Sequence, residues 1–230
     1  MLDQIRAVAF DLDNTLWDVG PIIVRAEQRL LEWLEEHYPR IPRRVSLEDM
    51  RAARLRLAEA EPHRAHDFTY LRTASLARHA EESGYEPEIA AQAFEIFFAA
   101  RNDIEPFADV LPALARLRTR YALATLSNGN ADLARMQSFA GAFKVSLNAR
   151  DVGSAKPHPR GFERLASALA LDPAEIIYVG DDPHHDIVGA RAAGLQTAWI
   201  NRRNDEWPMD APAPDLVVID CNDLAARLRV

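Results

Sequence analysis

The stretch AVAFDLDNTL, residues 7–16, decides the fold class of this chain. Its apolar run ends in two carboxylates spaced two apart, Asp11 and Asp13. A short apolar run bounded by polar residues is typical of a buried strand, so both carboxylates follow the carboxyl end of the first strand. In open α/β sheets, ligands bind in the crevice at that end. If the extended geometry continues to Asp13, both carboxylates face one site, where their repulsion favours a bound cation or a shared proton. The same dipeptide spacing also fits a solvated turn.

The composition is ordinary for a soluble globular protein. Of 230 residues, 48% are hydrophobic and 27% charged, and this length suffices for one large domain or a core with an insert. The apolar runs are shorter than the ~20 residues of a membrane span, and residues 1–6 hold no signal-peptide apolar region. Cys221 is the only cysteine, so we expect no intrachain disulfide and a cytoplasmic protein. The formal net charge of -8 disfavours nucleic-acid binding but allows a small phosphorylated ligand held by local cations.

Two kinds of pattern divide the chain. Residues 20–102 show apolar residues at helical spacing, broken by proline and glycine, and no strand pattern. Outside them strands alternate with helices, which predicts a Rossmann-like parallel sheet with helices on both faces. We therefore expect an α/β core of residues 1–19 and 103–230 with an inserted all-helical cap of residues 20–102. Because the insert follows the strand end that carries Asp11, the cap is expected to cover the site, exclude water and select substrates.

The expected elements follow from these patterns. The expected strands are Ile5–Phe10, Tyr121–Leu126, Lys144–Leu147, Ile176–Val179, Gln196–Ile200 and Leu216–Ile219. The expected helices lie at about 21–38, 46–61, 67–83, 87–102, 106–120, 131–139, 159–171 and 186–193. Ser46, and either Asp67 or Thr69, are candidate N-caps. The proline-rich residues 208–214 are expected to form a surface connection.

Four strand ends carry side chains that suit metal-assisted phosphoryl transfer. They hold, in chain order, Asp11 and Asp13; Ser127, Asn128 and Gly129; Lys156; and Asp181 and Asp182, with Asp186 a few residues on. Carboxylates can form a covalent phosphorylated intermediate, and hard oxygen ligands suit Mg²⁺. A serine hydroxyl, a backbone N–H and a lysine can meet the three equatorial phosphoryl oxygens, while a second carboxylate moves the proton. Each group alone fits a turn, a solvated lysine or a helix N-terminus, so the prediction depends on their joint order. His184 and His185 are expected on a solvent-facing turn rather than at the metal.

The chain resembles the haloacid dehalogenase-like hydrolase superfamily, in the branch with a helical cap after the first strand. The matching stretches are Asp11-Leu-Asp13-Asn-Thr15, Ser127-Asn128-Gly129, Lys156-Pro157 and Gly180-Asp181-Asp182 with Asp186. The resemblance implies a phosphatase in which Asp11 is the nucleophile and Asp13 the general acid and base. It also implies that Ser127 and Lys156 hold the phosphoryl group. The founding dehalogenases lack an acid two residues after the nucleophile and use no metal, so Asp13 favours a phosphatase.

The resemblance further implies a Mg²⁺ site. The metal residues it indicates are Asp11, Asp13 through its backbone carbonyl, Asp181 and Asp186. Asp186 is expected beside the metal, orienting Lys156 or a metal-bound water. Which of Asp181, Asp182 and Asp186 contacts the metal directly is left open.

A narrower likeness extends into the insert, to bacterial phosphatases that act on flavin mononucleotide and on the ribitylaminouracil phosphate of riboflavin synthesis. It depends on residues 13–18, 25–27, 60–62, 66–67 and 127–130. Trp17 is a candidate aromatic wall for a planar substrate ring, and alternatively a hinge residue packed on the first cap helix. We therefore rank these two phosphates first, nucleoside monophosphates second, and phosphoglycolate or sugar phosphates third. A phosphomutase and a non-catalytic binding protein on the same fold are the alternatives; the oligomeric state is left open.

Overall fold

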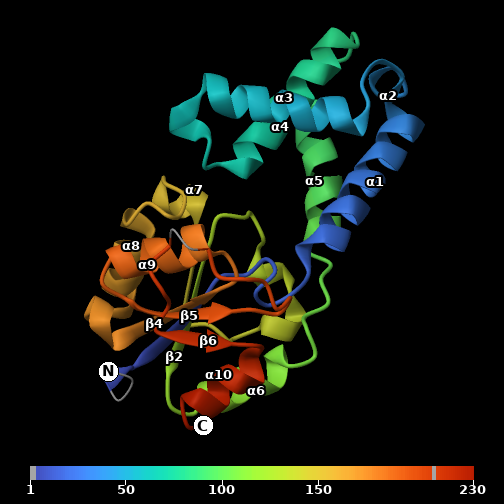
Figure 1. The fold of residues 1–230 in the computed structure, drawn as a ribbon. Helices are drawn as coiled ribbons and strands as arrows, with labels where there is room; N and C mark the ends of the chain where they lie inside the picture. Colours follow the sequence, from blue (N-terminus) through green and yellow to red (C-terminus); the bar gives the residue numbers. More distant parts are fainter. Residues whose placement is uncertain (1–3, 209–210) are drawn as a thin grey trace. The chain divides into compact units, whose positions relative to one another are not determined.

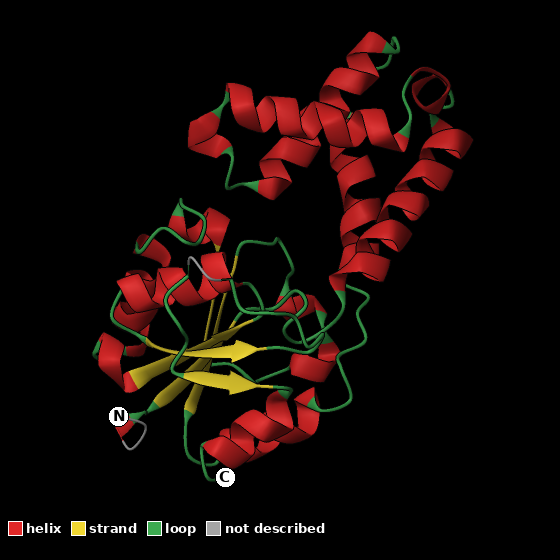
Figure 2. Cartoon of the chain, in the orientation of Figure 1, coloured by secondary structure: helices red, strands yellow, loops and turns green. Residues whose placement is uncertain are grey.

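The computed structural model describes residues 4–208 and 211–230 of the chain, which divides into two compact units. One unit comprises Met1–Asp18 and Glu105–Val230, and the other comprises Val19–Ile104. The first contains the strands and the second is helical (Figure 2). Residues 1–3 of the N-terminal prediction, and residues 209–210 of the expected proline-rich connection, lie outside the described residues.

A parallel sheet forms the centre of the first unit. Its strands, in the order β3-β2-β1-β4-β5-β6, are β1 (Ala7–Phe10), β2 (Ala122–Ser127), β3 (Val145–Asn148), β4 (Ile176–Gly180), β5 (Gln196–Ile200) and β6 (Leu216–Val218). β1 pairs in parallel with β2 on one side and β4 on the other, so the DLD stretch leaves the middle of the sheet. The expected strands are confirmed within the described residues, with ends that differ by at most two positions.

Helices cover both faces of this sheet (Figure 1). All of β1 is buried, and Ala7 and Ala9 pack with Phe162 and Leu165 of α8 (Arg160–Leu169) in one apolar cluster. α9 (Gly189–Ala192) lies on the side of α8, whereas α6 (Val110–Leu117) and α10 (Cys221–Arg227) pack together on the other side. A strand buried on both faces reads as a continuous apolar run, which is why AVAF shows no alternation. The expected fold class is confirmed.

The second unit is built from α1 (Val19–His37), α2 (Arg40–Arg44), α3 (Leu47–Ala60), α4 (Phe68–Glu82) and α5 (Ile89–Arg101). Leu30 and Leu34, one helical turn apart on α1, pack with Phe94 and Phe97 of α5. α1 and α5 lie side by side (Figure 1). Two helices of this unit start at the expected N-cap residues. Ser46 forms a capping box with Asp49 at the start of α3, and the Asp67 carboxylate accepts from the N–H of Tyr70 at the start of α4.

Two expected helices take another form. Residues 131–139 form two short 3₁₀ turns, Leu133–Arg135 and Gln137–Phe139, because Met136 between them has extended dihedral angles. The helix expected at 186–193 starts earlier, as a π-helical turn over Pro183–Val188 that continues into α9. The short helices α2, α10 and α7 (Ala149–Val152) were not expected, since four to seven residues are too few for a recognisable apolar period. Among the described residues, every helix is too short or too polar to cross a lipid bilayer.

Candidate active site

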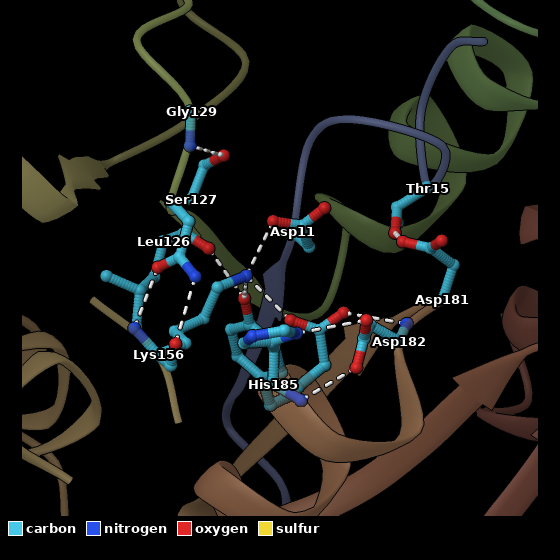
Figure 3. Close-up of polar contacts among 12 residues, drawn as sticks. Asp11, Thr15, Leu126, Ser127, Gly129, Lys156, Asp181, Asp182 and His185 are labelled. Atoms are coloured by element: carbon cyan, nitrogen blue, oxygen red, sulfur yellow. Dashed lines mark hydrogen bonds and ion pairs between the residues drawn. The ribbon is translucent and has the colours of Figure 1, made fainter. Parts of the chain in front are cut away.

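Lys156 lies within a buried network of charges beyond the carboxyl ends of the central strands (Figure 3). Its Nζ donates to Oδ1 of Asp11 at 2.6 Å, to Oδ1 of Asp186 at 2.6 Å and to the hydroxyl of Tyr178 at 2.8 Å. Burial alone would lower the pKa of Lys156, but the carboxylates of Asp11 and Asp186 outweigh it and raise that pKa well above the ordinary value. The ammonium therefore stays charged and all three of its donors are directed.

An acidic group surrounds this lysine. Carboxylate oxygens of Asp11, Asp181 and Asp186 lie within 4.8 Å of one another. Burial, with the neighbouring Asp186 charge, raises the pKa of Asp181 to about 7, and burial also raises the pKa of Asp11 well above its usual range. Negative charge crowded away from water favours a cation, and these hard oxygen donors fit Mg²⁺.

The contacts of each acid separate their roles. Asp186 is engaged on both oxygens, since Oδ1 accepts from Lys156 and Oδ2 accepts from the N–H of Asp182 at 3.1 Å. Asp181 is steadied by Thr15, whose hydroxyl donates to Oδ1 at 3.3 Å, and by Trp199, whose indole N–H donates to the Asp181 carbonyl at 2.8 Å. Asp11 and Asp181 are therefore the better candidates for direct metal ligands, with Asp186 orienting Lys156.

Asp182 belongs to the local turn instead. Its Oδ1 accepts from the backbone N–H groups of His184 and His185, both at 2.8 Å, and its Oδ2 lies 3.0 Å from the His185 ring. Both histidines are exposed, as expected for a solvent-facing turn. Gly180 precedes these acids because a Cβ there would lie 2.2 Å from Oδ2 of Asp186. A glycine at the end of β4 thus lets Asp186 approach the strand.

The loop after β2 contributes two side chains to the candidate site, those of Ser127 and Asn128. Ser127 is buried, and its Oγ accepts from the N–H of Gly129 at 3.1 Å. The side-chain amide of Asn128, a candidate substrate-binding residue, holds the backbone of Lys156: Oδ1 accepts from the Lys156 N–H at 2.7 Å, and Nδ2 donates to the Lys156 carbonyl at 3.0 Å. Asn128 thereby fixes the loop that presents the lysine.

Asp13 and Trp17 are paired with each other. Oδ1 of Asp13 accepts from Nε1 of Trp17 at 2.8 Å, and the Trp17 ring packs on Phe139 with a centroid separation of 5.7 Å. Trp17 is 0% exposed, so its ring faces other side chains, and this geometry does not support the expected aromatic wall for a substrate ring. The chain turns at Asn14, which has φ 63°, and the Asp13 carboxylate is outside the acidic group around Asp11.

The protein family of this chain was identified by comparison with family models. A family model described as haloacid dehalogenase-like hydrolase matches residues 5–194, most of the chain. The chain belongs to this hydrolase family. The resemblance and the hydrolase class expected from the motifs are confirmed.

Relatives of this hydrolase include several phosphatases. It is 32% identical to the 5-amino-6-(5-phospho-D-ribitylamino)uracil phosphatase of Escherichia coli over 209 residues, 89% of this chain and 87% of the relative. It is 38% identical to the phosphoserine phosphatase of Thermus thermophilus over 151 residues, 63% of this chain and 59% of that protein. A crystal structure described as 2-haloacid dehalogenase from Pseudomonas syringae matches with a TM-score of 0.91 at 34% identity, covering 97% of both chains. The family and its phosphatases support the expected class, a phosphomonoesterase.

One residue of this hydrolase's site, Tyr178, was missed by sequence reasoning. Its hydroxyl donates to the carbonyl of Leu126 at 2.6 Å and accepts from Lys156, so it connects β4, β2 and the lysine. In the sequence IIYVG it has the pattern of an ordinary core residue. The available signal was a hydroxyl within an otherwise apolar central strand, since buried tyrosine hydroxyls require a partner.

Proposed function

We propose that this hydrolase is a Mg²⁺-dependent phosphomonoesterase that works through an aspartyl-phosphate on Asp11. The observation that carries the proposal is the buried contact of 2.6 Å between Lys156 Nζ and Asp11 Oδ1, beside the acidic group with Asp181. A carboxylate beside a fixed cation can receive a phosphoryl group whose negative oxygens the cation then binds.

In the first proposed step, a carboxylate oxygen of Asp11 forms a bond to phosphorus while the ester P–O bond breaks. Asp13 gives its proton to the leaving oxygen. In the second step Asp13 takes a proton from water, which attacks the phosphoryl group and releases Asp11. Lys156 and Ser127 bind the phosphoryl oxygens throughout, and bound Mg²⁺ would neutralise the charge that develops on them.

For the substrate, we propose a small phosphorylated metabolite, with flavin mononucleotide and the ribitylaminouracil phosphate ranked first. The support is the similarity to the Escherichia coli phosphatase along most of both chains. Since Trp17 is buried, ring stacking on it no longer supports this ranking. Substrate selection by the helical unit and a cytoplasmic location also remain predictions.

The test is a panel of phosphate esters assayed for released phosphate with and without Mg²⁺, on wild type and Asp11→Asn. We expect turnover that requires Mg²⁺ and is abolished by Asp11→Asn, because an amide cannot replace the nucleophile. Beryllium fluoride should trap wild type at Asp11. If Asp11→Asn keeps a kcat near that of wild type, the covalent mechanism is wrong.

Two further arms separate the rival functions. Because the similar Pseudomonas structure is described as a 2-haloacid dehalogenase, 2-chloropropionate is tested as a substrate. Chloride release without phosphatase activity would show that the protein is a dehalogenase and not a phosphatase. Nuclear magnetic resonance of a sugar phosphate incubation detects a mutase as an isomer formed in place of free phosphate. Folded protein that turns over none of these compounds would indicate a binding protein.

A further inference from the structure

Trp17 is built into the turn that carries Asp13. The Asn14 N–H donates to the Trp17 carbonyl at 2.7 Å, and the Leu16 N–H donates to the Leu12 carbonyl at 2.8 Å. Asn14 has φ 63°, a left-handed conformation that asparagine tolerates better than most residues. Residues 12–17 therefore fold back on themselves, and the turn brings the indole to the carboxylate four residues before it.

The indole has little freedom once it is there. Its ring is fully buried and tilted by 54° against Phe139. A buried indole N–H needs an acceptor, and Asp13 Oδ1 supplies it at 2.8 Å. A hydrogen bond from a rigid donor to a carboxylate restricts the rotation of that carboxylate and fixes the direction of its oxygens.

We propose that Trp17 is a positioning residue, whose indole N–H aims the Asp13 carboxyl at the leaving oxygen of the substrate. This inference depends on the proposed function, in which Asp13 transfers a proton to that oxygen as the ester bond breaks. A general acid acts only when its proton lies within hydrogen-bond reach of the reacting atom, so the orientation of Asp13 sets its effect.

The chemistry of the leaving group gives this role a signature. An alkyl phosphate expels an alkoxide, which is a poor leaving group and needs the proton from Asp13. A p-nitrophenyl phosphate expels a stable phenolate, which leaves without one. Misplacing Asp13 therefore slows the first ester and spares the second, whereas a general loss of folding or of phosphate binding slows both.

The experiment compares wild type with Trp17→Phe on glycerol 2-phosphate and p-nitrophenyl phosphate, both with Mg²⁺. Phenylalanine keeps an aromatic ring against Phe139 and removes only the indole ring edge with its N–H. We expect kcat/KM for the alkyl ester to fall by roughly 10-fold or more relative to the aryl ester, part of the ~10²–10⁴-fold that acid–base catalysis provides. The kcat/KM value reports steps up to the first irreversible one, and the ratio of two esters does not depend on how much protein is folded.

Trp207→Phe is the matched control, since it removes an indole hydrogen bond to the carbonyl of Ala211 and should leave the ratio unchanged. Asp13→Asn is the reference and should show a larger selective loss. If Asp13→Asn is selective but Trp17→Phe lowers kcat/KM equally for both esters, or for neither, the inference is overturned. If Asp13→Asn is itself not selective, the acid role of Asp13 fails, and the inference fails with it.

Discussion

At the scale of single residues, the position of Lys156 depends on neutral groups as well as on charges. The Tyr178 hydroxyl both accepts from Lys156 Nζ and donates to the Leu126 carbonyl. We predict that Tyr178→Phe lowers kcat/KM by roughly tenfold, because one of three contacts that direct the ammonium is lost, at a cost in stability of about 1–3 kcal/mol for the unsatisfied carbonyl. Ester hydrolysis and urea unfolding measure the two effects.

Tyr121→Phe is the control for this prediction. The Tyr121 hydroxyl is buried in the same unit and donates to the carbonyl of Leu228 at 2.9 Å. Its removal should cost a similar free energy of unfolding without changing kcat/KM. If both variants lose the same activity, Tyr178 supports the fold and not Lys156.

At the same scale, the sequence predicted the residue types of the site better than their contacts. Asp11, Ser127, Lys156 and Asp181 follow strands in the expected order, because a parallel sheet brings the ends of separate strands to one edge. The partners of Asn128 and Trp17 were not predictable, since each depends on a turn whose dihedral angles the sequence pattern does not reveal. Tyr178 was not predicted as a site residue because its strand, IIYVG, has the ordinary pattern of a buried strand.

At the scale of an element, the end of β4 has no room for a side chain. A Cβ on Gly180 would lie 2.2 Å from Oδ2 of Asp186, and 2.3 Å from its Cγ. We predict that Gly180→Ala displaces Asp186 from Lys156, abolishes activity and destabilises the unit by about 3–5 kcal/mol, the usual cost of breaking a buried ion pair. Hydrolysis assays and urea unfolding check both parts.

Gly161→Ala on α8 is the matched substitution. Its Cβ would meet a methyl group of Leu126 at 3.1 Å, a flexible end that can move, and alanine is the better helix former. This variant should fold and remain active. A Gly180→Ala protein with full activity would show that Asp186 need not hold Lys156.

Element boundaries were harder to predict than element types. The strands were recognisable because short apolar runs end in turn residues. Ser46 and Asp67 were recognisable as caps by their position before apolar periodic segments. The π-helical turn over Pro183–Val188 was not, because Asp182 organises it by accepting two N–H groups, a contact with no periodic signature. Local polar contacts, rather than apolar periodicity, set such boundaries.

At the scale of the whole molecule, the acidic group couples folding to pH and to metal. The pKa of Asp181 is raised to about 7 in the metal-free chain, so between about pH 4 and 7 the folded state holds more protons than the unfolded state. Stability without metal therefore falls as pH rises through that range. We predict that Mg²⁺ raises the melting temperature more at pH 8 than at pH 5, because at pH 5 it must displace a proton. Thermal unfolding with Mg²⁺ or with a chelator measures this.

Asp181→Asn sharpens the test. It removes a charge that burial disfavours, so the metal-free variant should melt above wild type at pH 8, by about 2–4 °C for each 1 kcal/mol gained. Its response to Mg²⁺ should shrink at the same time. A variant that keeps the full response would exclude Asp181 as a ligand.

The two ends of the helical unit lie close together, and this affects how the gene for the protein can change by recombination. α1 and α5 run side by side, and Arg25 of the first pairs with Asp103 just after the second at 3.7 Å, so the two ends of Val19–Ile104 lie close together. Segments with neighbouring ends can be exchanged at two junctions without reconnecting the rest of the polypeptide. A gene for such a chain can replace this segment by recombination and leave the described strands of the sheet intact.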